Sequence, residues 1–296
     1  MTLSQLRTFV MVVQTGSVHA AAARLFVTQS AVSAAVSALQ RDLGVELVAR
    51  QGRGLRITPA GEAFAAHATT IVGLAEEARE VARGGVEPQR GRVRIGATTT
   101  VAEYVLPAFL ASFRRRYPEA DLQVEVGNRE RLWTLLHQHA VDVAFAGRPP
   151  EDADLAVRST RENSLVVVAS PEVASNASVA EPGQMTWLLR EEGSGTRATT
   201  QDYLSDSGVT PPTMTLGSNG AVVAGAEMGL GVTLVSGDAV RRELAEQRLV
   251  VLPLARTPLE RPWHVVSHHN PTATADLFVA HLHETDPPSG TPPFRP

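Results

Sequence analysis

Several residue types and patterns are missing from this chain, and each absence removes a class of function. None of the 296 residues is cysteine, which excludes thiol redox sensing and zinc sites with cysteine ligands. No apolar run reaches the roughly 18 residues that span a bilayer, and no charged-then-apolar leader opens the chain, so we expect a cytoplasmic protein. Lysine is absent too. We attribute the use of arginine alone to genomic base composition, although arginine also suits phosphate contact.

Length and charge say more about what the chain contains. With 296 residues, of which 43% are hydrophobic, it is long enough for about two domains with real cores. Residues 1–61 hold six arginines against one aspartate and one glutamate, a net charge of +4, whereas the whole chain carries −4. The remainder therefore carries −8. A basic head on an acidic body indicates an anionic partner for the head alone.

Three short helices are predicted at the N-terminus. Apolar residues from Leu3 to Val13 recur at intervals of three and four, which places them on one helix face. Gly16 ends that helix, and Ser17 can cap a second one over residues 18–25. Thr28 can cap a third helix, which Gly44 would end.

The third predicted helix has two different faces, and a basic hairpin follows it. An ordinary solvated face would also explain its polar side, but the cap-and-break pattern and the hairpin favour a winged helix-turn-helix over residues 1–58. The hairpin spans residues 47–58 and turns near Gly52 and Gly54. The apolar stripe of the helix comprises Val32, Val36, Leu39 and Leu43, its polar stripe comprises Gln29, Ser33, Ser37 and Gln40, and the hairpin carries Arg50, Arg53 and Arg56.

Short hydroxyl and amide side chains allow such a helix to enter the DNA major groove and to bond base edges. We expect two sets of DNA contacts. Gln29, Ser30 and Ser33 should read bases, whereas Ser17, Thr28, Arg50 and Arg53 should hold phosphates, with Arg53 entering the minor groove.

A longer helix is predicted to begin at Thr58-Pro59, where threonine can cap and proline suits the first turn. Its small and apolar residues follow alternating steps of four and three up to Gly84-Gly85, as in a coiled coil. Residues 59–90 are therefore interpreted as a linker and dimerisation helix with a hinge; packing on its own domain is the alternative. The seam comprises Phe64, Ala68, Ile71, Ala75, Ala78 and Ala82.

Residues 91–285 alternate predicted strands and helices, which indicates an α/β fold with mostly parallel sheets. We expect two lobes, roughly 91–165 plus 270–285 and 166–269, with a binding cleft between them. The proline-rich tail at 286–296 is predicted to be disordered.

Ligands in α/β lobes bind where strands end and helices begin, because free N–H groups and the helix dipole favour anions there. We therefore expect a small carboxylated or phosphorylated metabolite as effector, although simple helix capping would explain each residue singly. The candidate effector-binding residues lie at four strand ends: Thr98, Thr99 and Thr100; Gly147 and Arg148; Ser194, Gly195, Thr196 and Arg197; Ser218 and Asn219.

Three segments resemble LysR-type transcriptional regulators: TQSAVSAAVSALQRDLG resembles their recognition helix, LVARQGRGLRITPAG their wing, and SNGAVVAGAEMGLGVTLVS a second-lobe segment. FAGRPP and REEGSGTR are most similar to regulators of carbon-dioxide fixation genes within that family. The resemblance implies a winged helix-turn-helix, a linker helix and a two-lobed effector domain related to periplasmic binding proteins. It also implies dimers or tetramers on a two-fold symmetric DNA operator, with effector closure changing subunit geometry.

We therefore predict a ligand-gated transcription factor. A solute-binding protein, or a metabolite sensor without DNA binding, is the alternative that the lobes alone would suggest. An enzyme ranks last, because the sequence shows no activated nucleophile, acid–base pair or metal set. We expect no cofactor, metal or membrane partner.

Overall fold

The computed structural model describes residues 1–51, 54–84, 87–151, 155–176, 182–285 and 292–296. The predicted turn residue Gly52, the predicted DNA contact Arg53 and the predicted helix end Gly85 lie outside these ranges. Two compact units are present, Met1–Arg83 with His137–Ala140, and Gly84–Leu136 with Val141–Pro296.

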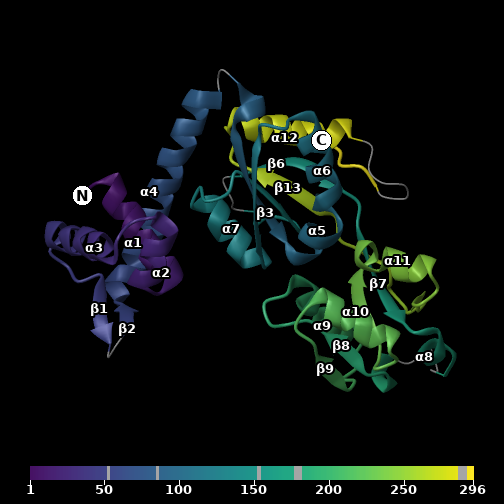
Figure 1. The fold of residues 1–296 in the computed structure, drawn as a ribbon. Helices are drawn as coiled ribbons and strands as arrows, with labels where there is room; N and C mark the ends of the chain where they lie inside the picture. The colour runs from purple at the N-terminus through teal and green to yellow at the C-terminus, as the bar shows by residue number, and fades with distance from the viewer. Residues whose placement is uncertain (52–53, 85–86, 152–154, 177–181, 286–291) are drawn as a thin grey trace. The chain divides into compact units, whose positions relative to one another are not determined.

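Helices and a hairpin build the N-terminal unit (Figure 1). Thr28 caps the third helix by accepting a hydrogen bond from the backbone N–H of Ala31 (3.2 Å), and Gly44 ends it in a left-handed conformation, as predicted. Val32 and Leu39 on that helix are fully buried. The elements are α1 (Leu3–Thr15), α2 (Val18–Leu25), α3 (Gln29–Leu43), the antiparallel pair β1 (Val48–Gln51) and β2 (Gly54–Ile57), and α4 (Pro59–Gly84).

The predicted seam of α4 divides into two parts. Ala68 is fully buried in the core of its own unit, and Phe64 packs against that core, so the alternative interpretation holds for this half of the helix. Further along, Ile71, Leu74 and Val81 are 42%, 45% and 52% exposed.

The first lobe of the effector unit is a five-stranded sheet. The sheet lies between helices (Figure 1). The strand order is β4-β3-β5-β13-β6, in which β3 runs parallel to β4 and β5 while β13 runs antiparallel to both neighbours. Helices α6 and α12 pack on one face and α7 on the other. The bounds are β3 (Arg92–Thr98), α5 (Thr99–Tyr104), α6 (Leu106–Arg116), β4 (Asp121–Gly127), α7 (Arg129–His137), β5 (Val143–Ala146), β6 (Ala156–Arg161), β13 (Trp263–Ser267) and α12 (Ala273–Glu284), after a 3-10 turn at Pro88–Arg90.

The second lobe is built around β7, which pairs antiparallel with β10, β11 and β12. Helices α9 and α10 cover opposite sides of its core. The bounds are β7 (Ser164–Ala169), α8 (Pro171–Asn176), β8 (Trp187–Leu189), α9 (Gly195–Asp206), β9 (Thr213–Thr215), α10 (Asn219–Glu227), β10 (Thr233–Ser236), α11 (Arg241–Ala245), β11 (Val250–Val251) and β12 (Leu259–Glu260), with 3-10 turns at Pro182–Gln184 and Gly237–Val240.

Three expectations about this unit need correction. The sheets are not mostly parallel. The chain crosses between the lobes at residues 162–163 and 261–262, and the strands that follow these crossings, β7 and β13, pair antiparallel with all their neighbours. The second lobe was expected to extend to residue 269, but it ends at the second crossing, since β13 belongs to the sheet of the first lobe. Finally, residues 292–296 are not disordered: Phe294 is 2% exposed and lies in the core of the first lobe.

No single helix within the described ranges is long and apolar enough to cross a membrane; α2 and α3 meet that criterion only as a pair bent by 108°.

A buried ion pair holds β3, the strand that ends at the predicted threonine cluster. The guanidinium of Arg94 donates to the carboxylate of Asp142 at 2.5 Å and 3.3 Å, and the backbone N–H of Arg94 donates to it at 2.7 Å. Two residues earlier on the same strand, Arg92 pairs with Asp121 at 2.6 Å, but both side chains are 42–48% exposed.

We expect Asp142→Ala to lower the free energy of unfolding by about 3–5 kcal/mol, because it strands a buried guanidinium. Asp121→Ala is the matched control and should cost about 0–1 kcal/mol, since water replaces the exposed carboxylate. Urea denaturation of both variants measures the difference. Equal losses would contradict the structural role of the buried pair.

Candidate functional site

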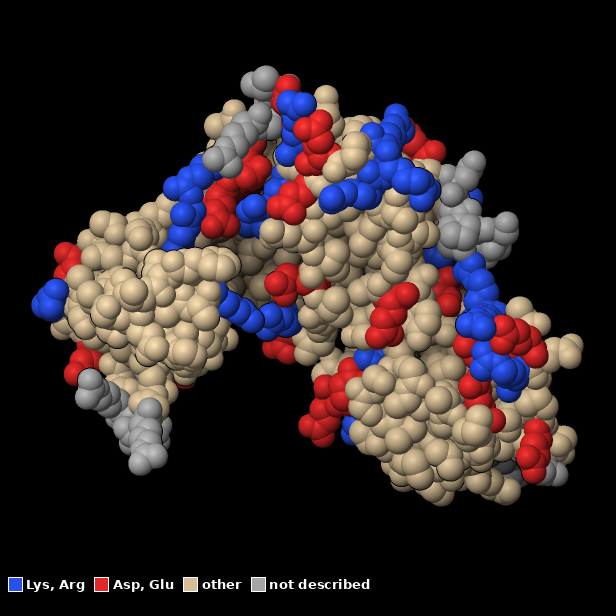
Figure 2. All heavy atoms as spheres, viewed as in Figure 1, with Lys and Arg blue, Asp and Glu red and all other residues tan. Residues whose placement is uncertain are grey.

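The N-terminal half of the polar face of α3 is exposed. Gln29, Ser30 and Ser33 are exposed, while Val32, Val36 and Leu39 on the other side of the helix are buried. Ser17, Gln29 and Ser33 also line a groove of about 460 Å³ among α2, α3 and the β1–β2 wing. Figure 2 shows few charged side chains on the viewed face of this unit.

The two predicted phosphate-binding hydroxyls also cap helices. Ser17 accepts a hydrogen bond from the backbone N–H of Ala20 at 3.4 Å, and the hydroxyl of Thr28 lies 2.9 Å from that of Ser30. The backbone of Arg50 lies in β1, but its side chain is outside the described part of the structure.

Two polar residues near this face have roles that the sequence did not reveal. Gln40 belongs to the predicted polar stripe, yet its side-chain oxygen accepts the backbone N–H groups of Leu47 and Val48 at 2.8 and 2.9 Å. It therefore anchors the wing to α3. His19 lies on α2 with its ring Nδ1 2.9 Å from the amide nitrogen of Gln29, so it orients that side chain.

A second candidate site lies between the two lobes of the effector unit, in a cavity of about 60 Å³. Its wall is made by the ends of strands and the first turns of α5, α7 and α9. The predicted residues that line it are Thr98, Thr99, Thr100, Gly147, Ser194, Gly195 and Thr196.

Four predicted effector residues do not line this cavity. Ser218 caps α10 by accepting a hydrogen bond from the N–H of Ala221 (3.1 Å), which fits the alternative of a helix cap. Arg197 donates to the carbonyl oxygen of Arg190 (2.9 Å), and Arg148 is an exposed residue that pairs with Glu151.

Asn219 is the fourth of these residues, and it joins the two lobes instead. It is 2% exposed, its amide donates to the hydroxyl of Thr100 in the first lobe at 3.1 Å, and its side-chain oxygen accepts from Arg190. A ligand that changes the distance between the lobes would therefore act on this contact.

Sequence reasoning missed the charged residues of the cavity, Arg129, Arg190, Glu191 and Arg261. Arg129 begins α7 directly after β4, so the strand-to-helix rule applied to the threonines would have found it. Arg190 and Glu191 form a two-pronged ion pair at 2.6 and 2.7 Å. The hydrogen bonds from Arg190 lower the pKa of Glu191, so this pair is neutral overall.

Arg129 and Arg261 have no carboxylate partner among the described residues. Each donates to a carbonyl oxygen, Arg129 to that of Arg148 (2.8 Å) and Arg261 to that of Gly195 (2.9 Å). Burial lowers the pKa of Arg261, and the charge of Arg129 lowers it further, although Asp202 opposes this. Arginine still stays protonated in proteins, so two positive charges share one small cavity.

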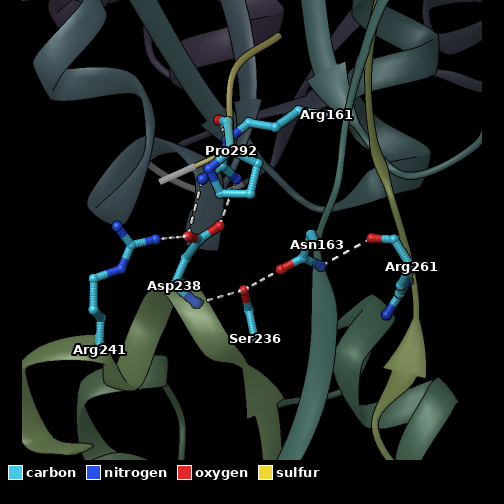
Figure 3. A network of polar contacts seen from close by, with 7 residues as sticks. All are labelled: Arg161, Asn163, Ser236, Asp238, Arg241, Arg261 and Pro292. Atoms are coloured by element: carbon cyan, nitrogen blue, oxygen red, sulfur yellow. Dashed lines mark hydrogen bonds and ion pairs between the residues drawn. The ribbon is translucent and has the colours of Figure 1, made fainter. Parts of the chain in front are cut away.

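Hydrogen bonds across the second crossing fix Arg261. Its backbone N–H donates to the carbonyl oxygen of Asn163 (2.8 Å), and the side-chain amide of Asn163 donates back to the carbonyl oxygen of Arg261 (2.8 Å). Figure 3 shows Asn163 between Arg261 and Ser236. The crossing segment therefore fixes the backbone of Arg261, whose guanidinium lines the cavity.

Comparison with known proteins decides the family. Residues 87–287 match the LysR substrate binding domain, and residues 3–62 match the bacterial regulatory helix-turn-helix protein, lysR family. The chain belongs to the LysR family of transcriptional regulators. This LysR regulator is 36% identical over 270 residues to the HTH-type transcriptional regulator CfxR of Cupriavidus necator, covering 90% of this chain and 85% of that one. It is 34% identical to the RuBisCO operon transcriptional regulator of Allochromatium vinosum over 269 residues, 89% of each chain.

Solved structures agree with the fold of this LysR regulator. A full-length variant of OxyR from Pseudomonas aeruginosa is similar over 95% of this chain and 93% of its own, with a TM-score of 0.70 and 24% identity. The CcmR regulatory domain of Synechocystis PCC6803, in complex with 2-PG, matches 64% of this chain and 96% of its own, with a TM-score of 0.55 and 26% identity. These comparisons confirm the predicted family, its fold class and the similarity to carbon-fixation regulators, and they place the chain among regulators rather than enzymes.

Proposed function

We propose that this LysR regulator binds a two-fold symmetric DNA operator in the cytoplasm and that a small anionic metabolite in the interlobe cavity modulates the binding. The observation that carries the effector assignment is the pair Arg129 and Arg261, which share the cavity without a carboxylate counterion among the described residues. Two like charges in a partly dry site repel each other, and a bound anion relieves that repulsion.

The rest of the cavity supports a compact carboxylated or phosphorylated ligand. The N-termini of α7 and α9 present free N–H groups at Arg129 and Thr196, and Thr98 to Thr100 add hydroxyl donors. A cavity of about 60 Å³ favours a ligand of a few heavy atoms over a drug-sized one. The complex of CcmR with 2-PG supports the same ligand class, since that domain is similar to this one.

On the DNA side, Gln29, Ser30 and Ser33 present donors and acceptors on an exposed helix face, as base readout requires. A symmetric operator needs two recognition helices about 34–36 Å apart, and hence two copies of the chain. The exposed stripe of α4, namely Ile71, Leu74, Ala78 and Val81, has the spacing of a coiled-coil seam and supports pairing with a second copy.

The first prediction concerns the anion site. A Cβ added at Gly195 would lie 2.7 Å from a guanidinium nitrogen of Arg261, so Gly195→Ala should displace that group from the cavity. We expect about a tenfold loss of affinity for 2-PG or inorganic phosphate in calorimetric titrations, the size of one hydrogen bond to a charged group. Gly220→Ala is the matched control, because a Cβ there meets open space in the first turn of α10. Unchanged affinity in Gly195→Ala would contradict the assignment.

The second prediction concerns base reading. Gln29→Ala should cost about 1–3 kcal/mol on the cognate duplex and relax discrimination at one base pair. Fluorescence anisotropy with the DNA upstream of its own gene, and with single-base variants of that DNA, measures both effects. A loss of the same size on every duplex would show that Gln29 contacts the backbone instead.

The third prediction concerns assembly. Leu74→Glu places a charge in the exposed stripe of α4 and should shift the chain toward monomers in analytical ultracentrifugation, with weaker operator binding as a consequence. Val45→Glu is the control, because Val45 is 46% exposed, like Leu74 at 45%, but lies outside the stripe. An unaltered oligomer in Leu74→Glu would remove α4 as the pairing surface.

A further inference from the structure

The last residues of the chain extend the sheet of the first lobe. Strand β6 is the edge strand of that sheet, and Thr160 exchanges two backbone hydrogen bonds with Arg295, at 2.7 and 2.8 Å. The hydroxyl of Ser159 donates to the carbonyl oxygen of Arg295 as well (2.7 Å). The ring of Phe294 lies in the core, with its centroid 5.3 Å from that of Phe109. Residues 292–296, which we call the C-terminal strap, are thus an integral part of the lobe.

The strap completes the surroundings of a buried charge. The side chain of Arg161 has no exposed area, and its guanidinium forms a two-pronged ion pair with Asp238 in the second lobe, at 2.6 and 3.0 Å. The remaining guanidinium nitrogen donates to the carbonyl oxygen of Pro292 (2.9 Å), and the ring of Phe294 lies 5.9 Å from the guanidinium carbon. A buried ion pair stays intact only while its other hydrogen bonds are satisfied.

The same contacts continue to Arg261, as Figure 3 shows. The backbone N–H of Asp238 donates to the hydroxyl of Ser236 (3.2 Å), which donates to the side-chain oxygen of Asn163. Asn163 in turn holds the backbone of Arg261 from both sides. A continuous polar chain therefore runs from Pro292, through both crossings, to the backbone of Arg261, whose guanidinium lines the cavity.

We propose that the C-terminal strap is a positioning element of the effector site, with Arg161 and Asn163 as the positioning residues that connect it to Arg261. This rests on the proposed function only in so far as Arg261 binds the effector. With the strap in place, Arg161 and Asp238 hold the turn after β10, and Ser236 and Asn163 hold the second crossing. Loss of the strap opens the Arg161 pair to water and loosens the crossing. By thermodynamic linkage, an anion bound at Arg261 must stabilise the docked strap in return.

Hydrogen–deuterium exchange on the ligand-free full chain tests the physical link directly. In Phe294→Ala, the backbone N–H of Arg261, which donates to Asn163, should exchange about five- to tenfold faster, the equivalent of losing about one net hydrogen bond. The N–H of Leu188, which donates to Val232 within the second lobe, should keep its rate. Arg295→Ala is the matched control, since it removes an exposed side chain and keeps the backbone bridge to Thr160.

If the strap is released in Phe294→Ala but the exchange rate at the N–H of Arg261 does not change, the proposal is overturned. Equal acceleration at Arg261 and Leu188 would overturn it as well, because it would mean general destabilisation. Should Phe294→Ala not fold, Ser159→Ala removes a single hydrogen bond to the strap and should produce the same pattern at smaller size.

A second measurement separates this inference from the proposed function. Phe294→Ala should bind 2-PG or inorganic phosphate about threefold or more weakly than the wild type, and saturating anion should slow exchange at the N–H of Arg295. A wild-type chain that binds neither anion would count against the proposed effector class, while the ligand-free exchange rates would still decide the role of the strap. The coupling would be overturned if the wild type binds the anion but Phe294→Ala binds it equally well and the anion does not slow exchange at the N–H of Arg295.

Discussion

Two positive charges share one small cavity of the effector unit without a paired carboxylate among the described residues. Arg129 comes from the first turn of α7, and Arg261 comes from the segment between β12 and β13 that crosses between the lobes. Neither has a carboxylate partner in the described part of the chain, and each is held by a backbone carbonyl oxygen instead. Because the crossing segment carries Arg261, this residue belongs both to the connection between the lobes and to the cavity wall.

Two further contacts join the lobes of this unit, and they lie at different places relative to the cavity. Asn219 bridges from α10 to Thr100 beside the cavity, whereas Arg161 and Asp238 pair away from its lining residues. A ligand that draws the lobes together would strain or shorten these contacts. In sequence, α4 joins the DNA-binding unit to this two-lobed unit.

The N-terminal unit was predictable from the sequence almost to the residue, because its signals are local. Thr28 and Gly44 bound α3 through cap chemistry that depends only on neighbouring residues, and Val32, Val36 and Leu39 of its apolar stripe are buried as expected. The limit there was the role of single polar side chains. Gln40 looks identical to Gln29 in the polar stripe, and only the position of the wing shows that its oxygen is already occupied.

The sequence predicted the polar residues that line the cavity but not its charged residues. Strand-to-helix turns brought Thr98 and Ser194 to it, since the carboxyl ends of neighbouring strands meet at one edge of a sheet. Arg261 could not be found in this way, because its position depends on a crossing between lobes far apart in sequence. The C-terminal strap was missed for a similar reason, since its proline-rich composition is typical of disorder. Its order depends on contacts far apart in sequence: Phe294 packs in the core of the first lobe, and Arg295 forms backbone hydrogen bonds with the edge strand β6.

Calorimetric titration of the full chain with 2-PG, inorganic phosphate and malonate, beside uncharged malonamide, tests the anion site most directly. We expect binding of at least one anion, abolished in Arg261→Gln, and no measurable heat from malonamide. Tighter binding of the neutral compound, or anion affinity that survives Arg261→Gln unchanged, would contradict this expectation.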